Sequence, residues 1–317
     1  MNGAYDAWLL WWPTEACHLR CGHCHYTPGR RVAPPPPPPP IDVDRVLAAL
    51  EATGRTFKLS FSGGGEPFLV PNLVQAAAEL SRRHFLSVNT NRTSAAVASF
   101  AEAVDPSRCD FIHASCHLEE LERTGLMARY LRNYHLLRER GFVVHCCAVA
   151  HPRLLPDLDR YREELAREGL PLQFSFFSGE HEGRLYPQSY TPEEIDRIRR
   201  PPLLPGVLQK SLQEYVPRKY DLPELDDDLY DVLRSPRGKL CNAGFNAAFV
   251  DSDGAVWRCL RIRDSLGRID GDLRFEAEPY ICQEEFCECP LKSYDIYLRD
   301  MAADEHVRRV APRPPRG

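Results

Sequence analysis

The chain has 317 residues, of which 43% are hydrophobic, and a net charge of −5 with histidine counted as neutral. This composition supports a large buried core, and no apolar run approaches the ~20 residues that a membrane-spanning helix needs. The apolar stretch at residues 5–13 is short and lacks a basic leader, so we expect no secretory signal and a cytoplasmic protein. Basic residues do not cluster with aromatic ones, which argues against a nucleic-acid surface.

A motif of three cysteines with the spacing C-x3-C-x2-C follows the first apolar segment. Its members are Cys17, Cys21 and Cys24. Thiols stay reduced in the cytoplasm, so clustered cysteines indicate metal or redox chemistry rather than disulfides. Four protein ligands close a structural zinc site, whereas three thiolates leave one iron of an iron–sulfur cluster open. His18, His23 and His25 could each supply a fourth ligand, so zinc stays an alternative.

A glycine-rich segment, Ser60 to Pro67, follows the β-rich run Thr56 to Phe61 and precedes a helical pattern that starts near Pro71. Glycines at the end of a strand let a ligand approach bare backbone, and Pro67 fixes the exit of the turn. Alone, the segment is also typical of an ordinary tight loop. Together with the cysteine motif it indicates a ligand site beside a metal site.

With these two motifs the chain resembles the radical S-adenosylmethionine (radical SAM) superfamily. The three cysteines match its cluster triad, and its glycine-glycine-glutamate-proline segment is matched by Gly64, Gly65, Glu66 and Pro67. The resemblance implies a 4Fe-4S cluster whose open iron chelates the amino and carboxylate groups of SAM, with the glycine segment holding the amino group. Reductive cleavage of SAM would then release methionine and a 5'-deoxyadenosyl radical.

The resemblance also implies further SAM contacts. His23 takes the position where the family usually has an aromatic residue, and we expect it to pack on adenine. Asn91 and Ser115 follow the third and fourth expected strands, where family members contact the methionine carboxylate and the ribose. A turn or helix cap is the alternative role for both residues.

Strand-like runs alternate with amphipathic helical stretches along the first 200 residues. The runs are 8–12, 56–61, 85–89, 110–116, 142–149 and 172–177. Six such repeats predict right-handed βαβ units and therefore an α/β fold, a partial (β/α)6 TIM-like barrel over residues 1–200. Chemistry in such sheets lies at the carboxyl ends of the strands, where both motifs fall. Cys109, Cys116, Cys146 and Cys147 lie in apolar runs and are expected to be core thiols.

The exit of the sixth expected strand carries a group of ionisable residues. Glu180, His181 and Glu182 lie between two glycines. These side chains suit a substrate pocket or a proton acceptor and are the candidate catalytic residues; a solvated loop is the alternative.

The C-terminal third is expected to hold a linker with a short helical element at 201–237, a second unit at 238–295, and a helix with a disordered basic tail at 296–317. Two β-like segments around Asp253-Gly254 predict a hairpin in the second unit. The same unit contains five cysteines, namely Cys241, Cys259, Cys282, Cys287 and Cys289.

This second unit is similar to the SPASM/twitch extension of radical SAM enzymes, which binds one or two auxiliary 4Fe-4S clusters. Five cysteines complete one four-thiolate cluster, not two. We therefore expect a twitch-like single cluster on Cys241, Cys259, Cys287 and Cys289, with Cys282 either a spare or the true third ligand. A zinc ribbon is the alternative, because four thiolates suit zinc equally well.

The resemblance leaves the substrate open, and we consider three functions. The first is a peptide-modifying enzyme, the second a dehydrogenase or epimerase of a small carbohydrate or aminocyclitol, and the third a non-catalytic metal-binding or electron-carrier protein. Either enzyme needs an electron donor such as flavodoxin or ferredoxin. Because no peptide-recognition domain precedes Trp8, the first function also requires a leader-binding protein in trans or leader binding on the barrel itself.

Overall fold

The computed structural model describes residues 5–24, 37–200, 237 and 240–285. The linker expected at 201–237 lies outside these residues except for Arg237, and the helix and tail expected at 296–317 lie outside them entirely. Cys287 and Cys289 are also outside the described residues.

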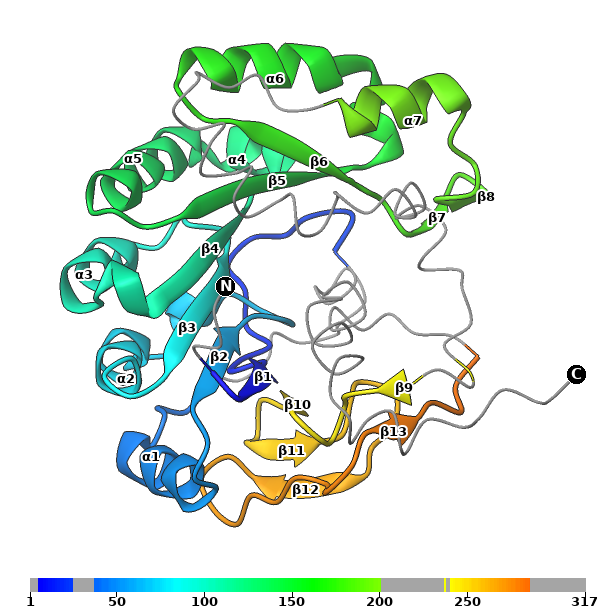
Figure 1. Ribbon diagram of the computed structural model, residues 1–317. Helices are drawn as coiled ribbons and strands as arrows, with labels where there is room; N and C mark the ends of the chain where they lie inside the picture. The colour runs from blue at the N-terminus through cyan, green and yellow to red at the C-terminus, as the bar shows by residue number, and fades with distance from the viewer. Residues whose placement is uncertain (1–4, 25–36, 201–236, 238–239, 286–317) are drawn as a thin grey trace, which may run out of the picture.

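Six parallel strands form the main part of a curved sheet, in the order in which they occur along the chain. They are β1 (Ala7–Trp11), β2 (Phe57–Phe61), β3 (Phe85–Thr90), β4 (Cys109–Ser115), β5 (Val144–Ala150) and β6 (Leu172–Phe176). Each lies within two residues of a strand expected from the sequence. Figure 1 shows the strands as an arc with helices along its convex side, which confirms the α/β partial barrel.

The helices that cover this sheet follow the strands in alternation. They are α1 (Val43–Ala52), α2 (Leu73–Leu80), α3 (Ala96–Ala103), α4 (Leu118–Thr124), α5 (Met127–Glu139), α6 (Leu158–Arg167) and α7 (Pro192–Arg199), with 3-10 turns η1 (Pro67–Leu69), η2 (Pro106–Arg108) and η3 (Pro152–Asp157). Capping chemistry fixes several starts: Asp42 accepts from the Arg45 amide before α1, and Thr191 with Glu194 forms a capping box on α7. None of the described helices is long and apolar enough to cross a membrane.

The strands are buried on the face that meets the helices. In β1 and β2 every residue is buried, as expected for parallel strands that are covered on both faces. Strand β5 instead alternates between buried and half-buried residues. Cys109, Cys116 and Cys146 are buried as expected, whereas Cys147 is half-buried because successive residues of a strand point to opposite faces.

The expected C-terminal hairpin is present and continues the barrel sheet. It consists of β10 (Ala247–Val250) and β11 (Ala255–Trp257), which pair antiparallel and are followed by β12 (Ser265–Arg268). Strand β10 pairs with β1 in parallel, so the described strands form one sheet in the order β12-β11-β10-β1-β2-β3-β4-β5-β6. Two short antiparallel pairs lie outside it: β7 (Gly179–His181) with β8 (Arg184–Tyr186), and β9 (Leu240–Cys241) with β13 (Tyr280–Ile281).

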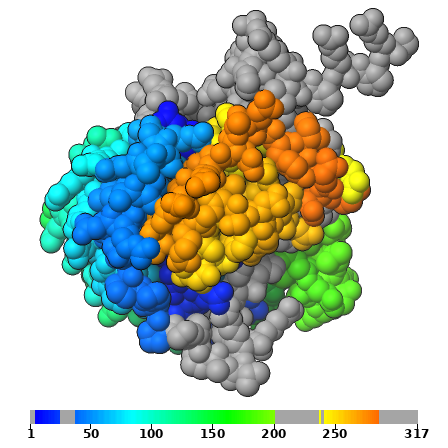
Figure 2. Space-filling model, turned by 90° about the horizontal axis from the view of Figure 1, so that it is seen from below, coloured from blue at the N-terminus to red at the C-terminus, as the bar shows by residue number. Residues whose placement is uncertain are grey.

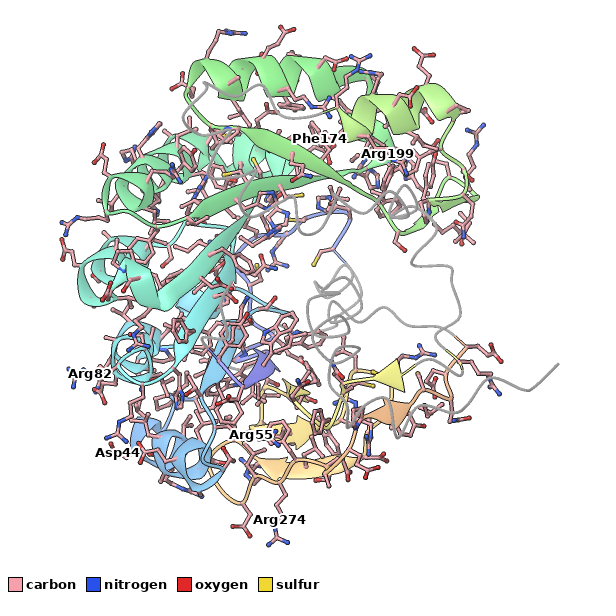
Figure 3. The ribbon with its side chains drawn as sticks, viewed as in Figure 1. Asp44, Arg55, Arg82, Phe174, Arg199 and Arg274 are labelled. Atoms are coloured by element: carbon pink, nitrogen blue, oxygen red, sulfur yellow. The ribbon has the colours of Figure 1, made fainter. Side chains whose placement is uncertain are left out.

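Arg55, labelled in Figure 3, connects the barrel to the C-terminal strands. Its Nη1 donates to the Phe245 carbonyl at 2.6 Å, and its guanidinium lies 4.8 Å from the ring centroid of Phe275. Figure 2 shows the yellow and orange C-terminal residues packed closely against blue N-terminal ones. The C-terminal unit is therefore an integral part of the barrel surface.

Candidate active site

The cysteine motif lies on a loop, residues 12–24, that leaves β1 and turns into the concave side of the sheet (Figure 1). The Glu66 amide after β2 donates to the Ala16 carbonyl at 2.8 Å. Further along, the Arg20 amide donates to the Glu120 carboxylate of α4 at 2.8 Å. The loop, called the cluster loop below, is thus tied to the carboxyl ends of two different strands.

The thiols of the cluster loop lie close enough to influence one another electrostatically. Burial, with smaller contributions from the nearby charges of Glu66 and Cys24, raises the pKa of Cys17 to about 11. Burial also raises the pKa of Cys21, with contributions from the Cys17 and Cys24 charges. The Asn91 amide donates to the Cys17 sulfur at 3.9 Å. Three thiolates would repel one another here, and a cationic metal centre would relieve that repulsion.

The glycine segment packs directly against the cluster loop. Gly63 has a φ of +95°, and a Cβ on it would lie 1.7 Å from the Trp12 ring. A Cβ on Gly65 would lie 2.2 Å from the carbonyl oxygen of Ala16. A Cβ on Gly64 would have its nearest neighbour at 3.7 Å, an ordinary contact. Close packing against the Trp12 ring and the Ala16 backbone therefore requires glycine at positions 63 and 65, whereas Gly64 has room for a small side chain.

The Glu66 carboxylate joins the ends of β2 and β3. It is 2% exposed and accepts hydrogen bonds from the Thr90 hydroxyl at 2.7 Å, the Asn91 amide at 2.7 Å and the Phe68 amide at 3.2 Å. Burial raises its pKa to about 7, and the three hydrogen bonds oppose that shift. The side chain of this residue is therefore occupied in holding the turn.

The two other SAM-contact candidates take part in hydrogen bonds at the strand ends. The Asn91 side-chain oxygen accepts from the amide and the hydroxyl of Thr93. Ser115 donates to the Asn89 side chain at 2.9 Å, and Asn89 donates to Ser62 at 3.3 Å. This polar row crosses the ends of β2, β3 and β4. Sequence reasoning singled out neither Asn89 nor Ser62 as a contact, although both follow or end expected strands.

Four histidines converge beside the cluster loop, and we call them the histidine group. The ring centroid of His23 lies 5.6 Å from that of His117, which precedes α4, and 5.9 Å from that of His151, which follows β5. The His151 ring lies 4.6 Å from that of His181 on β7. The sequence did not identify His117 and His151 as candidate site residues. A single histidine after a strand forms no motif that would indicate a function.

Burial lowers the pKa of both His117 and His151 to about 4. Both imidazoles are therefore neutral at physiological pH. His151 accepts a hydrogen bond from the Arg153 amide through Nδ1, which leaves the proton on Nε2. Among the other histidines near the motif, His18 shares a hydrogen bond with Thr93 at 2.6 Å, and His25 lies outside the described residues.

The three catalytic candidates are placed differently. Glu180 is exposed, and 83% of the Glu182 side chain is exposed. Only 21% of the His181 side chain is exposed, and its Nε2 lies 3.7 Å from the Glu182 carboxylate. Of the three, His181 is the residue that joins the histidine group.

Comparison with protein families gives one match. The model of the Radical SAM superfamily matches residues 12–169, which include the cluster loop, the glycine segment and the polar row. The chain belongs to the radical SAM superfamily. It is thereby an enzyme of that superfamily, and a comparison with curated proteins found no match to it.

Several solved structures are similar to this radical SAM enzyme in fold. Native anSMEcpe with bound AdoMet (SAM) has a TM-score of 0.51 and 19% identity, covering 83% of this chain and 78% of that one. Native anSMEcpe with bound AdoMet and Cp18Cys peptide has a TM-score of 0.50 and 18% identity, covering 83% and 77%. SuiB of Streptococcus suis, bound to S-adenosylmethionine, has a TM-score of 0.47 and 16% identity, covering 85% and 63%.

Membership of the superfamily implies a 4Fe-4S cluster and SAM. The residues present fit that cluster, because Cys17, Cys21 and Cys24 lie on one loop within electrostatic reach of one another. When bound, the cluster supplies the electron that cleaves SAM. The chain itself holds the cluster loop and the glycine turn in fixed contact at the carboxyl edge of the sheet.

The described C-terminal cysteines lie at two places. Cys241 pairs with Tyr280 in the β9–β13 ladder, and Cys282 directly follows Ile281, the last residue of β13. Cys259 accepts a hydrogen bond at its sulfur from the Ile262 amide at 3.1 Å. An amide that donates to a sulfur stabilises a thiolate.

Proposed function

We propose that this radical SAM enzyme abstracts a hydrogen atom from a peptide and that its C-terminal cysteines hold an auxiliary 4Fe-4S cluster. The main support for a peptide substrate is the similarity in fold to anSMEcpe, which extends over 83% of this chain. The anSMEcpe structures include complexes with the Cp18Cys and Kp18Cys peptides.

The arrangement of Cys241, Cys259 and Cys282 supports the auxiliary cluster. Cys241 lies in β9, and Cys282 directly follows β13, the strand that pairs with β9, so the paired strands bring these two segments together. The hydrogen bond from the Ile262 amide to the Cys259 sulfur is of the kind that tunes the reduction potential of iron–sulfur clusters. We therefore include Cys282 among the ligands, and Cys287 or Cys289 supplies the fourth thiolate.

We assign the role of proton acceptor to His181. A substrate that loses a hydrogen atom and then an electron must also release a proton, and the acceptor has to be basic at neutral pH. His181 is partly exposed, so a proton can pass from it to solvent, and it packs on the neutral His151 ring. Glu180 and Glu182 lie on the exposed side of the same β7–β8 hairpin. We rank them below His181 as proton acceptors.

The origin of the transferred hydrogen tests this function. Cells of the source organism are grown in deuterated medium, and their extract is separated into a peptide fraction and a small-molecule fraction. Each fraction is incubated anaerobically with reconstituted enzyme, reductant and unlabelled SAM. We expect deuterium in 5'-deoxyadenosine from the peptide fraction, and its loss after peptidase digestion. Deuterium that comes only from the small-molecule fraction would overturn the peptide assignment in favour of the carbohydrate or aminocyclitol function.

His181→Gln provides a second readout of the same proposal. The variant should cleave SAM without substrate at the wild-type rate but lose substrate turnover by about 10²-fold or more, the size of a general-base contribution. Glu180→Gln, on the exposed side of the same hairpin, is the matched control and should retain turnover. Equal loss in both variants would show that the hairpin acts only through its structure.

A further inference from the structure

Three potential metal ligands from two separate segments of the chain lie close together at the cluster loop. The sulfur of Cys21 and one ring nitrogen each of His23 and His117 all lie within 4.8 Å of one another. Cys21 and His23 come from the cluster loop, whereas His117 precedes α4, almost a hundred residues later in the sequence. Only Cys21 belongs to the iron–sulfur triad.

We propose that Cys21, His23 and His117 form a Zn²⁺ site that competes with the 4Fe-4S cluster for Cys21. One thiolate and two neutral imidazoles are a donor set that zinc accepts readily. Zinc bonds of about 2.0–2.3 Å place tetrahedral donors about 3.5 Å apart, so these side chains need to close by about 1 Å. All three side chains are half-buried, which leaves them the freedom to do so.

The binding step balances without any redox change. The Cys21 thiol releases its proton to solvent, and the sulfur and the two imidazole nitrogens bind Zn²⁺. Three protein ligands leave one coordination position for water. This site differs from a closed zinc knuckle built from the local motif, because His117 of the barrel replaces a cysteine of the loop, while His18 is engaged with Thr93.

Because the two metals share the Cys21 thiolate, zinc binding at this site affects assembly of the 4Fe-4S cluster. A zinc ion that occupies Cys21 withdraws that ligand from the triad, which then has too few thiolates for the cluster. Zinc-loaded protein is therefore an inactive form, and cluster assembly has to precede zinc or displace it. This inference concerns the protein before cluster assembly and does not depend on the substrate.

The two metals share Cys21 but differ in their other ligands, so mutations can distinguish the two sites. Cys17 belongs to the triad but not to the zinc ligands, and His117 belongs to the zinc ligands but not to the triad. His151 contacts His23 but is not one of the grouped ligands among the described residues. His151 is buried and serves as a control for packing around His23.

The test titrates Zn²⁺ into cluster-free full-length protein against a competing chelator, under anaerobic conditions. His117→Gln should weaken one zinc site by at least about tenfold, because losing a ligand costs no less than losing a supporting contact. Cys17→Ala and His151→Gln should keep that site at wild-type affinity. The C-terminal cysteines contribute equally to zinc binding in the wild type and the three variants. A difference in zinc affinity between these proteins therefore reports on the proposed site.

Reconstitution with iron and sulfide completes the test. His117→Gln should assemble the N-terminal cluster, and Cys17→Ala should not, which is the reverse of their zinc behaviour. Wild-type zinc affinity in His117→Gln would overturn the proposal, as would loss of the zinc site in Cys17→Ala. If His117→Gln neither folds nor assembles a cluster, His23→Gln takes its place with the same expected loss of zinc and the same contradicting result.

Discussion

The backbone of Gly65 lies against the carbonyl group of Ala16, so that a Cβ on this glycine would lie 2.2 Å from the carbonyl oxygen. The same carbonyl accepts the hydrogen bond of the Glu66 amide at 2.8 Å. Real Cβ atoms do not approach a backbone oxygen so closely, so only glycine fits. This one contact joins the cluster loop to the glycine turn and makes them a single structural unit.

Gly65→Ala should therefore disturb the cluster loop itself. The added methyl group meets backbone rather than a flexible side chain, so the loop must shift, at a cost of about 1–3 kcal/mol for an overpacked contact. We expect the variant to incorporate less iron at the N-terminal site after anaerobic reconstitution, measured as iron per chain.

Gly64→Ala is the matched control, because its Cβ has room. It should keep its iron, and a loss of SAM affinity in this variant would identify Gly64 as the backbone that approaches SAM. Wild-type iron content in Gly65→Ala would contradict the packing argument.

Glu66 should give the stability of the cluster-free protein a specific pH dependence. Burial raises its pKa from an ordinary 4.5 to about 7. The folded state then holds the proton more tightly than the unfolded chain, so this contribution favours folding fully below pH 4.5 and is lost as the pH rises to 7. A shift of this size is worth on the order of 3 kcal/mol.

Glu66→Gln removes that titration. The free energy of unfolding of the wild type minus that of the variant should therefore fall as the pH rises from 4.5 to 7, as measured by urea denaturation. Taking the difference cancels the groups that titrate in both proteins. A difference that stays constant with pH would show that Glu66 is ionised throughout.

The sequence predicted the six parallel strands because their apolar runs are local and separated by helical patterns. It also predicted the hairpin around Gly254, where the φ of +85° favours glycine. It did not predict that β10 pairs with β1, because pairing between segments more than 200 residues apart leaves no local signal. For the same reason His117 and His151 were missed: each is a single residue whose meaning comes from what the fold brings beside it.

The proposed auxiliary cluster makes a prediction about iron content. Replacing Cys241 and Cys282 by Ser should remove about four irons per chain, while SAM cleavage without substrate persists because the N-terminal triad is separate. Substrate turnover should fail. Cys109→Ala, which alters a buried thiol of the barrel core, is the control and should retain all its iron.

A zinc ion at the C-terminal cysteines would contradict the auxiliary cluster. If anaerobically purified protein contains one cluster's worth of iron and one zinc, and the Cys241 and Cys282 variant loses that zinc, the C-terminal unit is a zinc ribbon and the two-cluster account is wrong.

Reductive cleavage of SAM tests the central claim most directly. Wild-type protein and a variant with Cys17, Cys21 and Cys24 all changed to Ala are reconstituted anaerobically, reduced and incubated with SAM, and 5'-deoxyadenosine is measured. We predict product from the wild type and none from the variant, which should still hold about four irons on its C-terminal cysteines. Product formation by the triple variant at the wild-type rate would contradict the assignment of radical SAM chemistry to the cluster loop.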